Sequence, residues 1–199
     1  MIEIYTDGAC SAKNGHGPGG AAACVLNKDG ERSSSPVTLN CQDTTNQQME
    51  LSAVILGLAK AFSLITIIPQ IYEEDCKAIT VNSDSAYVIN CMNQHWYVNW
   101  LKNGWINSKK QPVANRELWE LLLKLLKIFN NNKYKITFNK VKGHSDNKYN
   151  NFVDKLAVEV KENTFSLTQN YEELVQFLRI LVDMVEERLM NDRNYSTCI

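Results

Sequence analysis

Four carboxylates stand where predicted strands and helices begin or end. Asp7 closes the first predicted strand, and Asp84 follows the strand that contains ITVNS. Glu50 lies in the first turns of the first long predicted helix, and Asp154 lies in a later helix. Ligands of open α/β sheets gather outside the carboxyl ends of parallel strands. Asp7 and Asp84 therefore project side by side if their strands are parallel neighbours, and the two helix residues can complete a cluster.

Clustered carboxylates point to a divalent cation. Four such groups repel one another, so one or more must be protonated unless a cation neutralises them. Hard oxygen ligands with room for water favour Mg²⁺ or Mn²⁺ over zinc. Two such ions about 4 Å apart suit phosphodiester hydrolysis, because one activates water and the other stabilises the leaving 3′-oxygen. Periodicity alone does not select these four residues, since an acid taken singly is more often a helix cap or a surface charge.

The hydrophobic patterns along the chain are typical of a mixed α/β domain. Thr45 and Gln48 form a capping box that marks the start of the first long helix. Asp29-Gly30 marks the turn of a hairpin. The predicted strands cover 2–7, 21–27, about 31–40, 78–81 and 135–142, and the predicted helices cover about 46–62, 87–92, 116–129 (capped by Asn115) and 150–161. This order predicts an antiparallel part built from the hairpin and parallel strands joined by helical crossovers.

The composition changes near residue 161 and predicts two parts, a domain over 1–160 and an extension over 161–199. The extension begins as a linker and continues as an amphipathic helix. Its apolar residues at three- and four-residue spacing are Tyr171, Leu174, Leu178, Leu181 and Val185. They cover fewer heptads than a coiled coil needs. Two interpretations stay open: the helix packs on its own domain, or it mediates a contact with a partner protein.

The net charge of −1 hides a segregated distribution. Residues 1–95 carry five basic and ten acidic groups, whereas residues 96–142 carry ten basic and two acidic groups, a net charge of +8. Such a segment in a nearly neutral chain suits a polyanionic partner. A solvated helix face explains the charges equally well, and Glu120 and Lys124 are spaced for an ion pair on such a face.

The cysteines and the N-terminal residues indicate the compartment. The six cysteines form no CxxC pair and have no zinc-site spacing. The chain begins MIEIYTDGA, without the basic and apolar regions of a secretory signal. We therefore expect an intracellular protein of the cytoplasm or nucleus, not secreted, with free thiols in a reducing compartment. The apolar stretch 51–69 contains Lys60, whose charge costs about 3 kcal/mol in a bilayer, so we expect a buried helix and no membrane partner.

Four segments occur in the order, and nearly the spacing, of a known family. They are YTDGAC (5–10), TTNQQMEL (44–51), VNSDSAYV (81–88) and KGHSDNKYNNFVDKLA (142–157). Together they resemble the signature segments of ribonuclease H, type 1, over roughly residues 1–160. The resemblance implies an α/β fold with a five-stranded mixed sheet of strand order 3-2-1-4-5 and helices on both faces. Residues 161–199 add a C-terminal helical extension to that fold.

The resemblance also assigns roles to particular residues. Asp7, Glu50, Asp84 and Asp154 match the family's metal-binding carboxylates, which hold two Mg²⁺ ions with substrate bound, or Mn²⁺ in their place. His144 matches the mobile catalytic histidine that assists proton transfer or product release. The implied reaction is endonucleolytic hydrolysis of the RNA strand of an RNA–DNA hybrid, which leaves 3′-hydroxyl and 5′-phosphate ends.

The basic segment resembles the family's basic protrusion, which holds the DNA strand of the hybrid. Lysines can follow the phosphates of a nucleic acid, and indole rings can pack on its sugars or bases. By the same resemblance Thr45 and Asn115 match positions that bind a DNA phosphate, and Asn46 and Gln47 match residues that reach the minor groove. The protrusion residues expected to contact substrate are Trp96, Trp100, Lys109 and Lys110. Core packing is the alternative for each tryptophan, and the stronger one for Trp105 and Trp119.

Some features depart from the family pattern without removing a catalytic residue. Asp43 stands where the family often has Arg, the segment around 63–76 is longer, and residues 162–199 have no counterpart in the motifs. Two classes stay open beside an active hybrid-specific ribonuclease. One is a catalytically silent module that binds hybrids, and the other is a general nuclease or transposase-like relative with the same fold.

Overall fold

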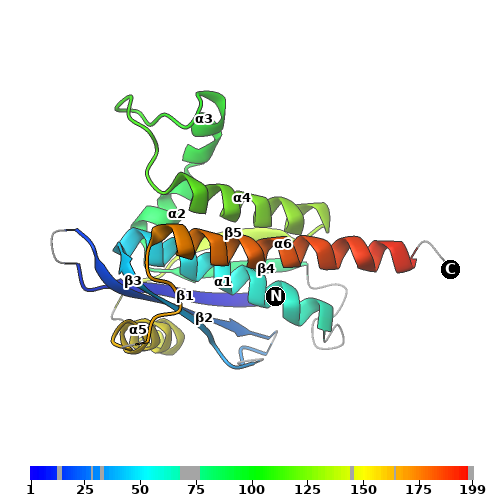
Figure 1. Ribbon diagram of the computed structural model, residues 1–199. Helices are drawn as coiled ribbons and strands as arrows, with labels where there is room; N and C mark the ends of the chain where they lie inside the picture. The colour runs from blue at the N-terminus through cyan, green and yellow to red at the C-terminus, as the bar shows by residue number, and fades with distance from the viewer. Residues whose placement is uncertain are drawn as a thin grey trace.

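One five-stranded sheet organises the protein (Figure 1). The computed structural model describes residues 1–12, 15–27, 29–31, 34–67, 77–143, 146–163 and 165–196, with side chains described up to residue 188. The strands are β1 (Ile2–Cys10), β2 (Gly17–Leu26), β3 (Val37–Thr44), β4 (Ala78–Ser83) and β5 (Lys135–Lys140). Their order in the sheet is β3-β2-β1-β4-β5, as predicted.

The sheet is mixed because its two halves are connected differently. β1, β2 and β3 are antiparallel neighbours joined by short connections, whereas β4 pairs parallel to both β1 and β5. Parallel strands need long crossovers, which helices supply here. β1 and β4 run in the same direction with Thr6 opposite Ser83, so Asp84, the residue after β4, comes next to Asp7. Asp7 lies inside β1, because this strand continues to Cys10 instead of ending at residue 7 as predicted.

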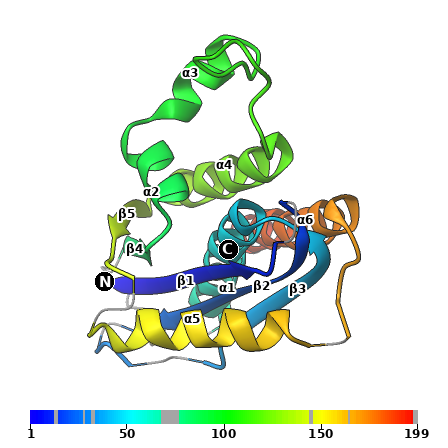
Figure 2. The ribbon, with the colours of Figure 1, turned by 90° about the vertical axis from the view of Figure 1, so that its left-hand side faces the viewer.

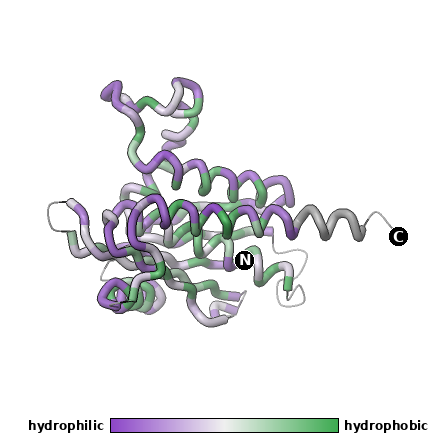
Figure 3. Tube along the Cα trace, viewed as in Figure 1, coloured by the Kyte–Doolittle hydropathy of each residue, from purple (hydrophilic) through white to green (hydrophobic). Residues whose placement is uncertain are grey.

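Helices cover both faces of the sheet (Figure 2). On one face α5 (Lys148–Lys161) packs on β1 and β2, and on the other α1 (Asn46–Ile67) packs on the same two strands. α4 (Arg116–Asn131) lies on the outer side of α1, and its turns alternate between hydrophilic and hydrophobic residues (Figure 3). The short helices α2 (Ala86–Asn93) and α3 (Trp96–Lys102) lead from β4 to the loop before α4.

Helix α1 is long and apolar enough to cross a membrane, but it serves as the central core helix. In its most apolar 18-residue window 78% of the residues are buried inside the protein. Leu51, Leu58 and Phe62 on this helix are 0–3% exposed. The stretch that resembles a membrane span therefore packs against the sheet, as the sequence predicted.

The C-terminal residues form a long helix, α6 (Tyr171–Ser196), which packs on α1 and α4 (Figure 1). Leu174, Leu178 and Val182 on α6 are fully buried and join the same apolar core as α1. Of the two interpretations left open by the sequence, packing on its own domain is the one that the structure shows for this helix.

Several element bounds differ from the predictions. The partner strand of β2 was expected over about 31–40 but is β3, eight residues from Val37 to Thr44, since the apolar residues Leu39 and Cys41 supply its buried side. β2 begins at Gly17, before the predicted start at residue 21. α1 continues to Ile67. Of the segment around 63–76, residues 68–76 lie outside the described part of the chain.

Helix α4 also corrects two local expectations. Asn115 occupies the position before the helix, but its side chain makes no capping hydrogen bond. Glu120 pairs with Arg116 at 2.8 Å, and Lys124 pairs with Asp183 and Glu186 of α6 at 2.8 and 2.6 Å. Lys124 therefore forms ion pairs with α6 instead of the predicted pair with Glu120 inside α4, because α6 brings two carboxylates to Lys124.

Candidate active site

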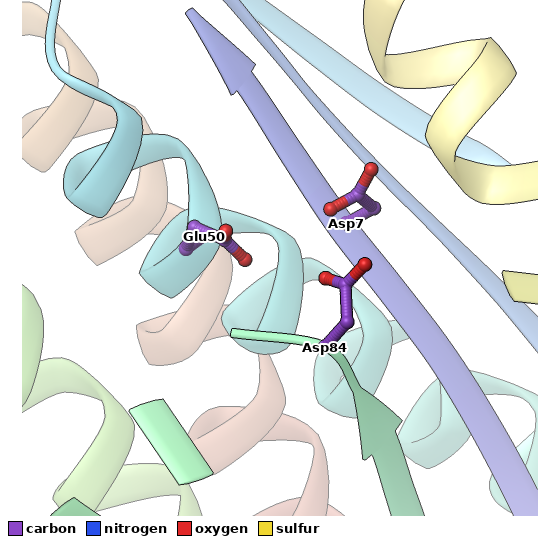
Figure 4. Close-up of side chains that lie close together, drawn as sticks. All are labelled: Asp7, Glu50 and Asp84. Carbon is purple, nitrogen blue, oxygen red and sulfur yellow. The ribbon is translucent and has the colours of Figure 1, made fainter. Parts of the chain in front are cut away.

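Three carboxylates meet at the edge of the sheet where β1 and β4 are neighbours. Asp7 projects from β1, Asp84 comes directly after β4, and Glu50 lies on α1, with the carboxyl groups directed toward one another (Figure 4). One oxygen of each lies within 4.8 Å of the others. Asp7 and Glu50 are buried, and Asp84 is half-buried. The parallel pairing of β1 with β4 brings the two aspartates together, as the sequence predicted.

Close backbone packing brings the third acid into reach. A Cβ atom on Gly8 would lie 2.3 Å from the backbone nitrogen of Glu50, so only glycine lets α1 approach β1 at this point. A Cβ on Gly143 would lie 2.6 Å from Oδ2 of Asp84, so a larger residue there would displace this carboxylate. Both glycines therefore belong to the geometry of the site.

The raised pKa values of Asp7 and Glu50 show that ionising these two acids is unfavourable without a cation. Burial, followed by the charges of Asp84 and Asp154, raises the pKa of Asp7 to about 8. Burial, followed by the charges of Asp7 and Asp84, raises the pKa of Glu50 to about 9. At neutral pH both acids therefore hold protons unless a cation takes their place.

The donor set fits a hard divalent cation. Asn46 donates from Nδ2 to Oε1 of Glu50 at 3.3 Å, whereas Oε2 of Glu50 is buried with no hydrogen-bond partner. A buried carboxylate oxygen without a partner is costly, and a metal ion would satisfy it. Asp7, Glu50 and Asp84 are thus the residues that would hold such an ion.

The fourth predicted acid, Asp154 on α5, lies beside Asp7 rather than inside the group of three. Its carboxylate interacts with that of Asp7 by charge and by a hydrogen bond. It is the one predicted ligand that comes from the opposite face of the sheet. His144, predicted to assist the reaction, lies outside the described residues.

Asn150 is a site residue that the sequence did not single out. It is fully buried, its Nδ2 donates to Oδ2 of Asp84 at 3.4 Å, and its Oδ1 has no partner. Asn147 caps α5 and accepts from the backbone nitrogen of Asn150 at 3.0 Å. Asn150 lies about one helical turn before Asp154 on α5, and this spacing is the signal that could have identified Asn150 from the sequence.

The predicted phosphate-binding residues lie in a second cluster, at the start of α1 and α4. The capping box is formed as predicted, since the backbone nitrogen of Thr45 donates to Oε1 of Gln48 at 2.9 Å and that of Gln48 donates to Thr45 Oγ1 at 3.2 Å. Nε2 of Gln48 donates to Oδ1 of Asn115 at 3.3 Å, and Nδ2 of Asn115 donates to the Tyr87 hydroxyl at 3.4 Å. Gln48 therefore joins the two positions expected to bind a phosphate. We call Thr45, Gln48 and Asn115 the phosphate platform.

The basic protrusion consists of α3 and the loop that follows it, and it projects away from the sheet (Figure 2). Trp96 is exposed, and Trp100 is partly buried against Trp105 and Trp119 with ring centroids 6.1 and 5.5 Å away. Trp105 and Trp119 are buried in the core, which confirms the stronger of the two alternatives for these residues, core packing. A groove on this side is lined by Gln47, Trp96, Trp100 and Lys109, among others.

The loop of the protrusion is a tight turn that exposes two lysines. Oδ1 of Asn107 accepts from the backbone nitrogens of Lys109 at 2.9 Å and Gln111 at 3.0 Å. Lys110 has a positive φ of 59°. Both lysine side chains are exposed, and Asn46 and Gln47 at the start of α1 are exposed as well. Of the predicted substrate residues, Asn46 contacts Glu50, and Gln47 shares the groove with Lys109.

The fold and the acidic site agree with a match to a known family. The family model for RNase H matches residues 1–162 of this chain. The chain belongs to the ribonuclease H family. Membership makes it a nuclease of the hydrolase class, and its cluster of Asp7, Glu50 and Asp84 is compatible with metal binding.

Curated ribonucleases H resemble the chain over most of their length. Ribonuclease H of Thermoanaerobacter sp. (strain X514) is 44% identical over 165 residues, which are 82% of this chain and 92% of that protein. Ribonuclease H of Clostridium botulinum (strain Hall / ATCC 3502 / NCTC 13319 / Type A) is 47% identical over 161 residues, which are 81% of this chain and 95% of that protein.

Solved structures share the fold at lower identity. LC11-RNase H1 in complex with RNA/DNA hybrid has a TM-score of 0.56 at 19% identity, covering 80% of this chain and 95% of that one. The foamy viral protease-reverse transcriptase in complex with RNA/DNA hybrid has a TM-score of 0.62 at 22% identity, covering 81% of this chain and 20% of that one. The ribonuclease H fold is thus common to all three.

Proposed function

We propose that this ribonuclease H hydrolyses the RNA strand of RNA–DNA hybrids by two-metal-ion catalysis, leaving 3′-hydroxyl and 5′-phosphate ends. The observation that carries the proposal is the meeting of three acids within 4.8 Å, two of them buried with strongly raised pKa values. A protein that only binds nucleic acid has no need of repelling acids beside its basic surface. The relatives named ribonuclease H, and the hybrid in the LC11-RNase H1 structure, support the choice of substrate.

Each residue of the site has a defined task in this proposal. Asp7, Glu50 and Asp84 hold the divalent ions, with Asp154 beside Asp7 as the fourth ligand. When bound, Mg²⁺ or Mn²⁺ supplies an activated water and stabilises the leaving 3′-oxygen. Asn150 keeps Asp84 oriented through its hydrogen bond. His144 assists proton transfer or product release.

The substrate surface lies beside the acids. Thr45 and Asn115 bind a phosphate of the DNA strand, and Asn46 and Gln47 reach the minor groove. In a hybrid that groove displays the 2′-hydroxyl groups that distinguish RNA from DNA. Trp96, Trp100, Lys109 and Lys110 hold the DNA strand in the groove of the protrusion. The exposure of Asn46, Gln47 and both lysines supports this arrangement.

Cleavage of labelled hybrid by the wild type and by Asp84→Asn tests the proposal. Loss of a metal ligand removes several kcal/mol of transition-state stabilisation, so we expect cleavage to fall about 1,000-fold or more. Hybrid binding should persist. Asp29→Asn, an exposed acid at the hairpin turn, is the matched control and should cut at the wild-type rate.

The products and the substrate range distinguish the alternatives. Fragments should accept a labelled 5′-phosphate from a kinase only after phosphatase treatment, because the cut leaves 5′-phosphate ends. Hybrid binding without cleavage over a full Mg²⁺ and Mn²⁺ titration would instead establish a silent binding module. Equal cutting of duplex DNA or of single-stranded RNA would establish a general nuclease.

A further inference from the structure

The two halves of the phosphate platform come from separate parts of the chain. Thr45 lies at the junction of β3 and α1, and Asn115 lies at the start of α4. One side chain of the platform joins them directly, through the 3.3 Å hydrogen bond from Gln48 to Asn115. A phosphate held by both residues depends on the spacing between these two elements, so whatever fixes that spacing controls the affinity.

The segment before α6 attaches to the first of these elements. The backbone nitrogen of Gln42 donates to the carbonyl of Thr168 at 3.0 Å, and that of Asp43 donates to the carbonyl of Gln169 at 3.0 Å. The Thr168 hydroxyl donates to the carbonyl of Asn40 at 3.1 Å, and this threonine is 3% exposed. Residues 168–169 thus hydrogen-bond along the outer edge of β3, at residues that come shortly before Thr45.

The next residues reach the second element. The hydroxyl of Tyr171, the first residue of α6, donates to Oε2 of Glu117 at 2.9 Å. Glu117 lies in the first turn of α4, two residues after Asn115. Burial and the Glu117 carboxylate both raise the pKa of Tyr171, so its hydroxyl keeps the proton that it donates.

Two side-chain hydrogen bonds order the piece between the two attachments. The backbone nitrogen of Glu173 donates to Oδ1 of Asn170 at 3.0 Å, and that of Gln169 donates to Oε2 of Glu173 at 2.9 Å. The first bond caps the start of α6, and the second holds Gln169 against its first turn. The sheet edge and the start of α4 are therefore connected through one short, ordered turn.

We propose that residues 168–171, which lie outside the match to the family over residues 1–162, form a clamp that fixes the spacing of Thr45 and Asn115 and so sets the affinity for the DNA strand. The clamp rests on the proposed function, because it acts on the platform that binds the hybrid. Tyr171 is a positioning residue in it, since it acts on substrate through Glu117 and α4.

The variant Tyr171→Phe in the full-length protein tests the clamp. It removes one hydrogen bond to a carboxylate, so we expect KM and Kd for the hybrid to rise about two- to fivefold, with kcat unchanged. The side-chain amide resonances of Gln48 and Asn115 should shift in the NMR spectrum of the free protein. Asp183→Asn is the matched control, because it breaks an α6–α4 ion pair away from the platform and should leave KM and Kd unchanged.

Three results would overturn the clamp. Unchanged KM and Kd in Tyr171→Phe would overturn it, whatever the melting temperature. An equal rise in Asp183→Asn would show that any loosening of α6 has the same effect. A wild-type protein that neither binds nor cuts the hybrid would overturn the proposed function and the clamp together, and the wild-type assay identifies that case by itself.

Discussion

The carboxylate cluster and the layer of helices α1, α4 and α6 share helix α1 but differ in the side chains that they bury. The cluster buries acids, and the layer buries apolar side chains. In its second turn α1 buries Glu50, whose Oε2 has no partner and whose pKa is about 9. In later turns it buries Leu58 and Phe62 against a purely apolar core. Apolar burial stabilises the fold, whereas clustered buried acids destabilise it until a cation arrives. Stability and chemistry are thus separated along the helix.

The largest effect on stability should come from the helical layer. Leu178→Ala removes a fully buried side chain of α6. Such a change costs about 2–5 kcal/mol of the free energy of unfolding, which lowers Tm by about 4–20 °C in a protein of this size. Calorimetry or circular dichroism measures it. The matched control is Ile180→Ala on the same helix, 53% exposed, which should change stability by less than about 0.5 kcal/mol.

This variant also tests whether α6 belongs to the fold of the domain. At temperatures where Leu178→Ala is folded, its kcat should equal that of the wild type. A melting temperature equal to that of Ile180→Ala would contradict the comparison, since α6 would then add nothing to the common core.

A second effect, of opposite sign, should come from the carboxylate cluster. Asp7→Asn removes one of the repelling buried acids, so in EDTA at pH 9 it should be more stable than the wild type and have a higher Tm. The pKa shift of Asp7 from about 4 to about 8 sets an upper bound of about 5 kcal/mol on this difference. The same variant should lose cleavage activity. Asp29→Asn, an exposed acid, is the control and should leave Tm unchanged.

The pH dependence of that difference follows from the direction of the pKa shift. In the unfolded chain Asp7 ionises near pH 4, whereas in the folded protein its pKa is about 8. The folded wild type therefore loses stability relative to Asp7→Asn as the pH rises from about 4 to about 8. Thermal melts at pH 5 and pH 9 measure this. An equal difference at both values would show that Asp7 ionises normally.

The smallest effect should come from the exposed lysines of the protrusion, which lie outside both the core and the carboxylate cluster. The double variant Lys109→Ala and Lys110→Ala removes two exposed charges. We expect KM for the hybrid to rise severalfold and the slope of log Kd against log salt to fall by about 2, with kcat and Tm unchanged. Lys77→Ala at the opposite end of the sheet is the control and should leave the slope as it is. An unchanged slope in the double variant would place the DNA strand elsewhere.

The sequence predicted the features that depend on neighbours along the chain. The capping box of Thr45 and Gln48 and the burial of α1 follow from local patterns, and the order of the five strands follows from the resemblance to the family. The structure confirms all three. The meeting of Asp7 and Asp84 follows too, because β1 and β4 are parallel neighbours, although β1 continues past Asp7 to Cys10.

Other features could not be predicted because they depend on groups distant in the sequence. Lys124 was expected to pair with Glu120, but α6 brings Asp183 and Glu186 to it. Asn115 was expected to cap α4, yet Gln48 and Tyr87 hold its side chain. A helical ion pair is worth a few tenths of a kcal/mol and a helix cap about 1 kcal/mol, and in both cases this local preference yields to partners that only the fold supplies.

The sequence by itself thus determined the family, the fold and the acids, since the residue types and their order carry that information. Only the tertiary structure decided how these acids share one buried space, and that the C-terminal residues connect β3 to α4. The physical reason is that buried charge and hydrogen-bond geometry depend on distances between elements. A pattern along one chain fixes which residues face the core, but the packing of helices on the sheet fixes which of them meet.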